Sequence, residues 1–287
     1  MITRKHFISG VVSASAGLVV SAAGSGGRPL AAMLMTGARF FSAGDSAALR
    51  RRVRDAGRNA VLVDVQDSVS YPSHPEIATR RSLDHRKAAS LVEEWNRDGL
   101  VVFPLLDFCT ANDSWLGVYD RMVCSKPYDA LVKDLIADAY RIFAKPEYIH
   151  IGFSNEDRQN HPKGGYAVMR QGDLWMRYLA RTSDWVKETG ARTWAWFDYP
   201  WGMKDFLADC PRDILYSNLK PLSEKRTADR FAQVAGHGCD VAPFLRSDED
   251  AAVAAKLPQA RVVGDVRELA SLPPQEHVGT AKPDLSR

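Results

Sequence analysis

The chain has 287 residues, a net charge of +3, 45% hydrophobic residues and 25% charged residues. This composition is typical of one large globular domain, which at this length can fold without disulfide or metal staples. Basic and acidic residues are interleaved along the whole chain, unlike the basic stripe that nucleic-acid-binding proteins usually carry. We therefore expect no nucleic-acid partner, and we interpret the arginine-rich run 50–54 as a solvated helix face.

The N-terminus has the layout of an export signal. Arg4 and Lys5 precede a weakly apolar stretch from Ile8 to Ala23 that is rich in Gly, Ala and Ser. The segment resembles a twin-arginine translocation signal in which Lys5 replaces the second arginine. It is too short and too polar for a typical membrane span, although an uncleaved anchor is the alternative. We expect residues 1–28 to be a signal and linker that engage the export machinery, and the mature protein to be periplasmic or secreted.

Beyond the signal, short apolar runs alternate with longer amphipathic stretches. The apolar runs predict eight strands, over 30–36, 59–65, 101–108, 147–153, 192–199, 213–219, 240–245 and 261–266. The amphipathic stretches predict helices over 45–57, 87–98, 128–144, 171–190, 203–208, 224–235 and 248–256. Strands that alternate with helices imply a parallel sheet with helical crossovers. Eight such units predict a (β/α)8, TIM-type barrel over residues 29–272 and a tail over 273–287, with the last two strands weakest.

A doubly wound nucleotide-binding sheet is the alternative fold, and it needs a glycine-rich phosphate turn after an early strand. The turn after the first predicted strand, residues 36–41, has no G-x-G-x-x-G pattern, and Gly236-His237-Gly238 precedes a strand instead of following one. No G-K-[ST] motif exists either. We expect neither a nucleotide partner nor another cofactor.

Four cysteines follow the signal, namely Cys109, Cys124, Cys210 and Cys239. None belongs to a C-x-x-C pair, which argues against a zinc or thioredoxin-like site. An exported protein can oxidise such residues, so disulfides and buried free thiols both remain open.

Polar and aromatic side chains gather where the predicted strands end. Barrel enzymes build their active sites at the carboxyl ends of the strands. Carboxylates recur there after four neighbouring strands, at Asp64, Asp107, Glu156 and Asp198. Aromatic, imidazole and amide groups accompany them, at Trp115, His150, Trp196, Tyr199 and Asn218. Each residue alone could cap a helix or fill a core, but agreement among four strand ends favours a polar pocket.

Such a pocket suits a saccharide. Aromatic faces stack on sugar rings, Asp and Asn bond the hydroxyls, and two carboxyls can flank a glycosidic bond. Metal chemistry has less support, because the seven histidines form no H-x-H or H-E-x-x-H pattern and only His74 and His150 fall near strand ends. We expect no metal site. No G-x-S-x-G elbow for a serine nucleophile is present.

The stretch Tyr148–Glu156 resembles the strand-four motif of family 20 hexosaminidases, in which His-x-Gly is followed by x-Asp-Glu. Four further segments resemble a group of exported bacterial barrel proteins related to those glycosidases, namely Ser73–Ala78, Thr110–Gly117, Trp194–Tyr199 and Asp213–Asn218. The resemblance covers roughly residues 60–220 and implies a (β/α)8 barrel that hydrolyses glycosides.

One departure from that family pattern concerns the catalytic pair. In the family, the Glu of the Asp-Glu pair protonates the leaving group. Ser154 and Asn155 stand at those two positions here, and Glu156 follows. Either Glu156 has taken over the role, or the pair is lost, because an amide donates no useful proton at neutral pH.

We expect an extracytoplasmic glycoside hydrolase with Glu156 as general acid and Asp198 or Asp107 as the second carboxylate. His150 would position a hydroxyl or hold Glu156. The sugar platform and hydroxyl contacts would come from Trp115, Trp196, Tyr199, Asp64 and Asn218. The alternatives are a catalytically degenerate saccharide-binding barrel and, less favoured, a metal-dependent hydrolase.

Overall fold

A computed structural model describes residues 28–42, 46–110, 112–154, 156, 170, 172–197 and 206–269. Its strands are β1 (Leu30–Thr36), β2 (Ala60–Asp64), β3 (Val101–Leu105), β4 (Tyr148–His150), β5 (Arg192–Trp196), β6 (Leu215–Ser217), β7 (Phe244–Leu245) and β8 (Gly264–Glu268). Its α-helices are α1 (Gly37–Phe40), α2 (Ser46–Asp55), α3 (His85–Arg97), α4 (Lys126–Ile142), α5 (Asp173–Thr189), α6 (Phe206–Asp209), α7 (Lys225–Gly236) and α8 (Asp248–Ala254).

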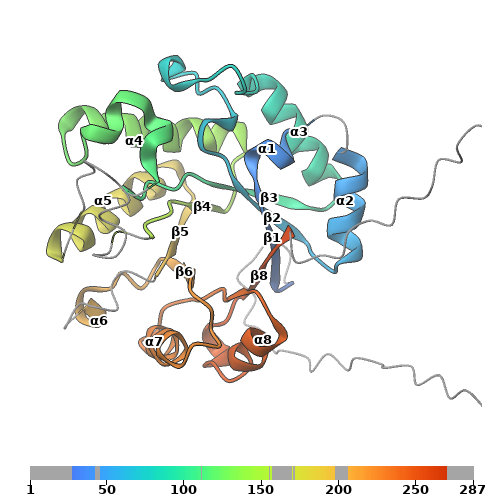
Figure 1. The fold of residues 1–287 in the computed structure, drawn as a ribbon, viewed down its shortest axis with the longest axis vertical. Helices are drawn as coiled ribbons and strands as arrows, with labels where there is room; N and C mark the ends of the chain where they lie inside the picture. Colours follow the sequence, from blue (N-terminus) through green and yellow to red (C-terminus); the bar gives the residue numbers. More distant parts are fainter. Residues whose placement is uncertain are drawn as a thin grey trace, which may run out of the picture.

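The eight strands form one parallel sheet in the order β6-β5-β4-β3-β2-β1-β8-β7, with the helices around its outside (Figure 1). This arrangement confirms the predicted (β/α)8 barrel. The barrel is nearly closed, because the two ends of the sheet meet at the isolated bridge between Tyr216 of β6 and Val241, which precedes β7. The predicted weakness of the last strands appears as a β7 that is only two residues long.

Side chains join β6 to β7 where the backbone ladder is missing. The Asn218 amide nitrogen donates to the carbonyls of Phe244 (3.1 Å) and Lys220 (2.9 Å), and its oxygen accepts from the Phe244 N–H (2.9 Å). The Ser217 hydroxyl donates to the Ala242 carbonyl. We call this region, between Leu215–Asn218 and Val241–Leu245, the seam.

Local signals in the sequence account for the helix ends. The Asp84 carboxylate accepts from two N–H groups of the first turn of α3, and the Ser125 hydroxyl does the same once at α4. Gly190 ends α5 in a left-handed conformation, at φ 95°. The short helix α1, which the sequence did not predict, begins where the Thr36 hydroxyl accepts from the Arg39 N–H (3.3 Å).

Alternation along the strands divides the core into two layers. Side chains such as Leu62, Phe103, Trp194 and Phe244 fill the inside of the barrel, whereas their sequence neighbours pack against the helices. The inner positions nearest the carboxyl ends then fall to polar residues, because Asp64 follows Leu62 by two residues. The strand pattern thus aims the polar groups at the mouth of the barrel.

Residues 1–27 and the predicted tail 273–287 lie outside the described residues, so the predicted domain bounds stay predictions. Among the helices of the described part, none is long and apolar enough to cross a membrane.

Candidate functional site

Two carboxyl groups, Asp64 and Asp107, occupy the ends of the adjacent strands β2 and β3. Asp64 is the last residue of β2 and pairs in register with Leu105. The chain stays alongside β4 beyond Leu105, since Phe108 N–H donates to the Ile151 carbonyl (3.0 Å). Strand spacing therefore places the Cα atoms of Asp64 and Asp107 roughly 8 Å apart. We call these two groups the Asp64–Asp107 pair.

Asp107 is 6% exposed, and one of its oxygens has no hydrogen-bond partner among the described residues. Its other oxygen accepts from the Asn112 amide (3.1 Å). Burial raises the pKa of Asp107 to about 7, with the Asn112 hydrogen bond opposing and the charge of Asp64 adding to the rise. A carboxyl of this kind is partly protonated at neutral pH.

Gly152, in the resemblance motif after β4, makes room for that carboxyl. Its φ is +77°, and a Cβ atom at this position would overlap the Asp107 carboxyl oxygen. The glycine is therefore required both by backbone conformation and by the close approach of Asp107.

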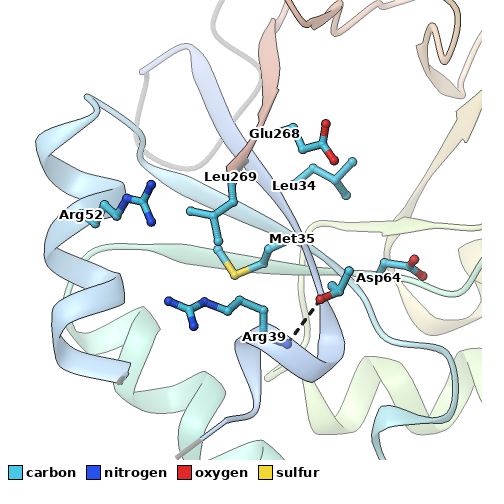
Figure 2. Close-up of a pocket in the computed structure, with 8 residues that line it drawn as sticks. Leu34, Met35, Arg39, Arg52, Asp64, Glu268 and Leu269 are labelled. Carbon is cyan, nitrogen blue, oxygen red and sulfur yellow. Dashed lines mark hydrogen bonds between the residues drawn. The ribbon is translucent and has the colours of Figure 1, made fainter. Parts of the chain in front are cut away.

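A cavity of about 430 Å³ adjoins Asp64 at the carboxyl ends of β1, β2 and β8. Its lining comprises Leu34, Met35, Thr36, Arg39, Arg52, Asp64, Glu268 and Leu269. Figure 2 shows Arg39 and Arg52 on the helix side of Met35, and Asp64 on the barrel side. Burial raises the pKa of Asp64 to about 6, with the hydrogen bond from Gln66 opposing. The cavity therefore offers guanidinium donors at one side and a carboxyl that holds a proton in mild acid at the other.

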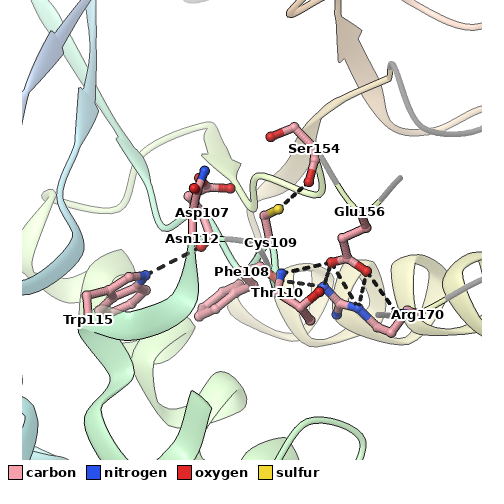
Figure 3. Close-up of polar contacts among 9 residues, drawn as sticks. All are labelled: Asp107, Phe108, Cys109, Thr110, Asn112, Trp115, Ser154, Glu156 and Arg170. Atoms are coloured by element: carbon pink, nitrogen blue, oxygen red, sulfur yellow. Dashed lines mark hydrogen bonds and ion pairs between the residues drawn. The ribbon is translucent and has the colours of Figure 1, made fainter. Parts of the chain in front are cut away.

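Glu156 lies at the same end of the barrel but in a closed ion pair with Arg170, which we call the Glu156–Arg170 pair (Figure 3). Both side chains are fully buried. The Arg170 Nε lies 3.0 and 3.1 Å from the two Glu156 oxygens, and Thr110 N–H donates to one of them (3.1 Å). The guanidinium also stacks on Phe153 and Tyr178, at 4.2 and 4.8 Å from their ring centres.

Both oxygens of Glu156 accept hydrogen bonds in this arrangement, whereas a general acid must carry a proton on one of them. Glu156 is thus held in a closed pair by Arg170, a cation that the sequence did not predict as its partner. Arg170 lies 14 residues along the chain, beyond any helix or strand spacing, so no local pattern connected it with Glu156.

His150 is fully buried inside the barrel beside β5. Its Nδ1 accepts from the Gly152 N–H (3.0 Å), so its proton lies on Nε2, which has no partner in the described part of the chain. Burial holds the pKa of His150 well below its ordinary value. The ring packs against Trp196, with centroids 4.5 Å apart, and in the described part of the chain no hydrogen bond joins it to Glu156.

The predicted sugar platform is largely packed away. Trp115 is 7% exposed and lies between Phe108 and Tyr71, with ring centroids at 6.0 and 6.3 Å. Its indole N–H reaches the Asp107 carbonyl (3.4 Å), which ties this ring to the Asp64–Asp107 pair. Trp196 is 4% exposed, between His150 and Phe244. Both tryptophans therefore build the wall behind the site.

The remaining predicted site residues are Asn218, Asp198 and Tyr199. Asn218 lies at the barrel mouth, but both ends of its amide are engaged by the backbone of the seam. Asp198 and Tyr199 lie outside the described residues. Within the part of the chain that the structure describes, no group of three or more His, Cys, Asp and Glu side chains could hold a metal ion.

A further acidic side chain, Asp113, shares this region and had no role assigned from the sequence. It is 4% exposed and opens the 3₁₀ helix Asp113–Arg121. Burial, aided by the charge of Asp120, raises its pKa to about 8. Its position next to Asn112, which bonds Asp107, was the available signal.

No family model matches the chain, and no curated protein matches it. Solved structures of family 20 β-N-acetylhexosaminidases are similar in fold. The enzyme from Streptomyces coelicolor has a TM-score of 0.62 at 13% identity, over 84% of this chain and 59% of its own. A variant Streptomyces plicatus β-hexosaminidase in complex with GlcNAc gives 0.63 at 13%, over 85% and 59%.

The exo β-N-acetylglucosaminidase from Vibrio harveyi, in complex with N-acetylglucosamine, gives a TM-score of 0.60 at 12% identity, over 85% of this chain and 50% of its own. The chain thus spans between half and three fifths of the length of these three structures. At such identities the likeness shows a shared TIM-type barrel, a fold that glycoside hydrolases use.

Proposed function

We propose that this chain is a glycoside hydrolase-like protein that binds a saccharide at the mouth of the barrel and cleaves a glycosidic bond with the Asp64–Asp107 pair. The observation that carries the proposal is the buried Asp107 carboxyl beside the end of β2, with one oxygen that has no hydrogen-bond partner among the described residues; burial raises the pKa of this carboxyl to about 7. A carboxyl that keeps its proton near neutral pH is the usual acid of glycosidases.

Asp107 serves as the proton donor in this proposal, and Asp64 as the second carboxylate. The pKa of Asp64 is raised to about 6, so between about pH 6 and 7 the pair holds roughly one proton. Inverting glycosidases separate their carboxyls by about 6.5–9.5 Å and retaining ones by about 5–5.5 Å. The neighbouring strand ends are compatible with either spacing.

The sequence predicted Glu156 as the acid and Asp198 or Asp107 as the second carboxylate. The Glu156–Arg170 pair favours Asp107 over Glu156, because Arg170 and Thr110 already occupy both Glu156 oxygens. Asp198 remains an alternative partner for Asp107.

The cavity beside Asp64 supports a saccharide as the ligand. Its volume of about 430 Å³ lies within the range of small-ligand pockets. Asp64 and Glu268 can accept from sugar hydroxyls, and Arg39 and Arg52 can donate to ring or substituent oxygens. Two of the similar structures contain N-acetylglucosamine (GlcNAc). Aryl N-acetylglucosaminides are therefore the first substrates to assay.

Hydrolysis of an aryl glycoside panel by two matched variants, compared with the wild type, tests the proposal. We expect Asp107→Asn to lower kcat/KM by about 10²–10⁴-fold, since it removes the proton and keeps the shape. We expect Glu156→Gln, assayed well below its unfolding midpoint, to keep most of the activity per folded molecule. The reverse order of the two losses would return the role of acid to Glu156.

A saccharide-binding barrel without catalysis is the second candidate, and the closed Glu156–Arg170 pair favours it. On this alternative the wild-type protein hydrolyses no glycoside of the panel, yet N-acetylglucosamine or a chito-oligosaccharide binds in calorimetry. Binding that Asp64→Asn and Arg52→Met weaken, without turnover in the wild type, would replace the hydrolase proposal.

We also propose that residues 1–28 are removed on export and that the barrel acts in the periplasm or outside the cell. The charged start and the weakly apolar stretch from Ile8 to Ala23 support this. N-terminal sequencing of the exported protein should begin between about Ala22 and Arg28. An intact Met1 on cytoplasmic protein would contradict it.

A further inference from the structure

Two cysteine thiols meet at the amino ends of the strands that flank the seam. Cys210 lies between α6 and β6, and Cys239 lies between α7 and β7. Their sulfur atoms are 3.9 Å apart, and the two residues are 5% and 0% exposed. A disulfide has an S–S distance of about 2.05 Å, so each sulfur must move by only about 1 Å.

We propose that Cys210 and Cys239 are a modification site that is oxidised to a disulfide, with a low-molecular-weight disulfide such as oxidised glutathione as the oxidant. The Cys210 thiolate attacks one sulfur of the oxidant, forms a mixed disulfide and releases one glutathione thiol. The Cys239 sulfur, after losing its proton, then attacks Cys210 and expels the second thiol. Two protein thiols and one disulfide give one protein disulfide and two glutathione thiols, so atoms and electrons balance.

The surroundings of the pair assign the attacking role to Cys210. Hydrogen bonding with Cys239 lowers the pKa of Cys210, with burial opposing and the nearby Tyr216 hydroxyl (3.4 Å) adding to the decrease. The pKa of Cys239 is raised by the same hydrogen bond and by burial. Because both sulfurs are enclosed, the exchange begins on a locally opened form in which Cys210 still lies beside Cys239, and the closed barrel then holds the bond.

The other two cysteines are poorly placed to compete. Cys124 is exposed, in the loop that precedes α4. Cys109 is buried in the site region, where its sulfur contacts the Ser154 carbonyl. The pairing of Cys210 with Cys239 is therefore specific.

The bond would reinforce the seam, where the two ends of the sheet meet without a strand ladder. Asn218 joins β6 and β7 at their carboxyl ends, through both ends of its amide. The disulfide would join the segments that lead into the same two strands at their amino ends. Oxidation thus fastens the seam at the end opposite to Asn218 and restricts the unfolded chain through a loop of about 30 residues.

The test is to refold the chain in a glutathione redox buffer and, in parallel, with reductant. We expect the count of thiols titrated in denaturant to decrease from four to two on oxidation. Trypsin should then release a peptide of residues 205–212 cross-linked to one of residues 231–246. We expect the oxidised form to unfold at a temperature on the order of 5–10 °C above the reduced form.

The control is Cys124→Ser, which should keep both the cross-link and the temperature difference, whereas Cys239→Ser should lose both. If Cys239→Ser does not fold, the wild-type comparison with and without reductant still decides. Four titratable thiols after oxidation, or a cross-link to Cys109 or Cys124, would overturn the proposal.

Discussion

Two acidic regions at the same end of the barrel have opposite chemistry. Among the described residues, each carboxyl of the Asp64–Asp107 pair has one oxygen without a hydrogen-bond partner, and burial raises both pKa values. The Glu156–Arg170 pair is buried as deeply, but a guanidinium and a backbone N–H engage its carboxylate. Burial without a cation favours a carboxyl that holds a proton, whereas burial with a cation fixes a charge in place.

Residue type and strand position alone therefore do not tell whether a buried carboxyl favours its protonated form. The groups that contact the carboxyl contribute to that balance as well. Glu156 has the residue type and nearly the position that the family resemblance gives to the acid, and Asp107 has the environment that an acid needs. Variants of the two pairs can separate the effect of residue position from the effect of the environment of the carboxyl.

The largest effect is expected on breaking the Glu156–Arg170 pair. Glu156→Gln leaves the guanidinium of Arg170 buried without its counter-charge, which should lower the free energy of unfolding by about 3–5 kcal/mol. Urea unfolding at pH 7 measures it. Because apolar replacement of a whole buried pair is often neutral, Glu156→Leu combined with Arg170→Met should recover much of the loss.

The matched control is the exposed pair of Lys225 and Asp229, where Asp229→Asn should cost less than about 0.5 kcal/mol. Equal costs for Glu156→Gln and Asp229→Asn would contradict the closed arrangement of the buried pair.

The next effect concerns the pH dependence of stability. The folded pKa of Asp107 is raised from 3.8 to about 7, so the folded protein binds a proton that the unfolded chain releases. Asp107 stabilises the folded state below about pH 4, and this contribution to the free energy of unfolding is lost as the pH rises to about 7. Asp107→Asn should therefore gain stability over the wild type as the pH rises from 4 to 8, by up to about 4 kcal/mol.

Urea unfolding across that pH range measures the difference between the two proteins. A difference that stays constant with pH would mean that Asp107 titrates as an ordinary carboxyl.

A smaller effect is expected at Gly152, which makes room for Asp107. Gly152→Ala introduces a side chain at φ +77° and an overlap with the Asp107 carboxyl. We expect a loss of about 2–3 kcal/mol in the free energy of unfolding, from backbone strain and overpacking together. The matched control is Gly57→Ala, at φ +72° in open space, which should show the strain alone. Equal losses at the two glycines would remove the support for close packing around Asp107.

The sequence predicted the barrel because strand and helix periodicities are local and repeat eight times. It also placed Asp64 and Asp107 correctly at the carboxyl ends of β2 and β3, since strand parity and register follow from the same pattern. What it could not give were partners from distant segments. Arg170 reaches Glu156 across a long connection, and no periodicity encodes that contact.

The aromatic residues illustrate a second limit. A Trp that follows a strand can stack on a sugar or fill the core. Its position in the sequence does not distinguish these two roles, whereas its packing in the structure does. Trp115 and Trp196 turned out to be enclosed by other rings, which is a property of the assembled core. Asn218 shows the same limit. The sequence predicted that its amide bonds sugar hydroxyls, whereas in the structure the amide bonds the backbone of Phe244 and Lys220.

The seam between β6 and β7 is where we expect local opening of the barrel in solution to begin. Strands β1 and β2 have a ladder of five register pairs on each side, whereas β6 and the segment that leads into β7 meet at one bridge and a few side-chain contacts. Local opening there breaks fewer backbone hydrogen bonds than opening at β1 or β2. Backbone amides of β6 and β7 should therefore take up deuterium before those of β1 and β2, and this segment should open before that side of the barrel.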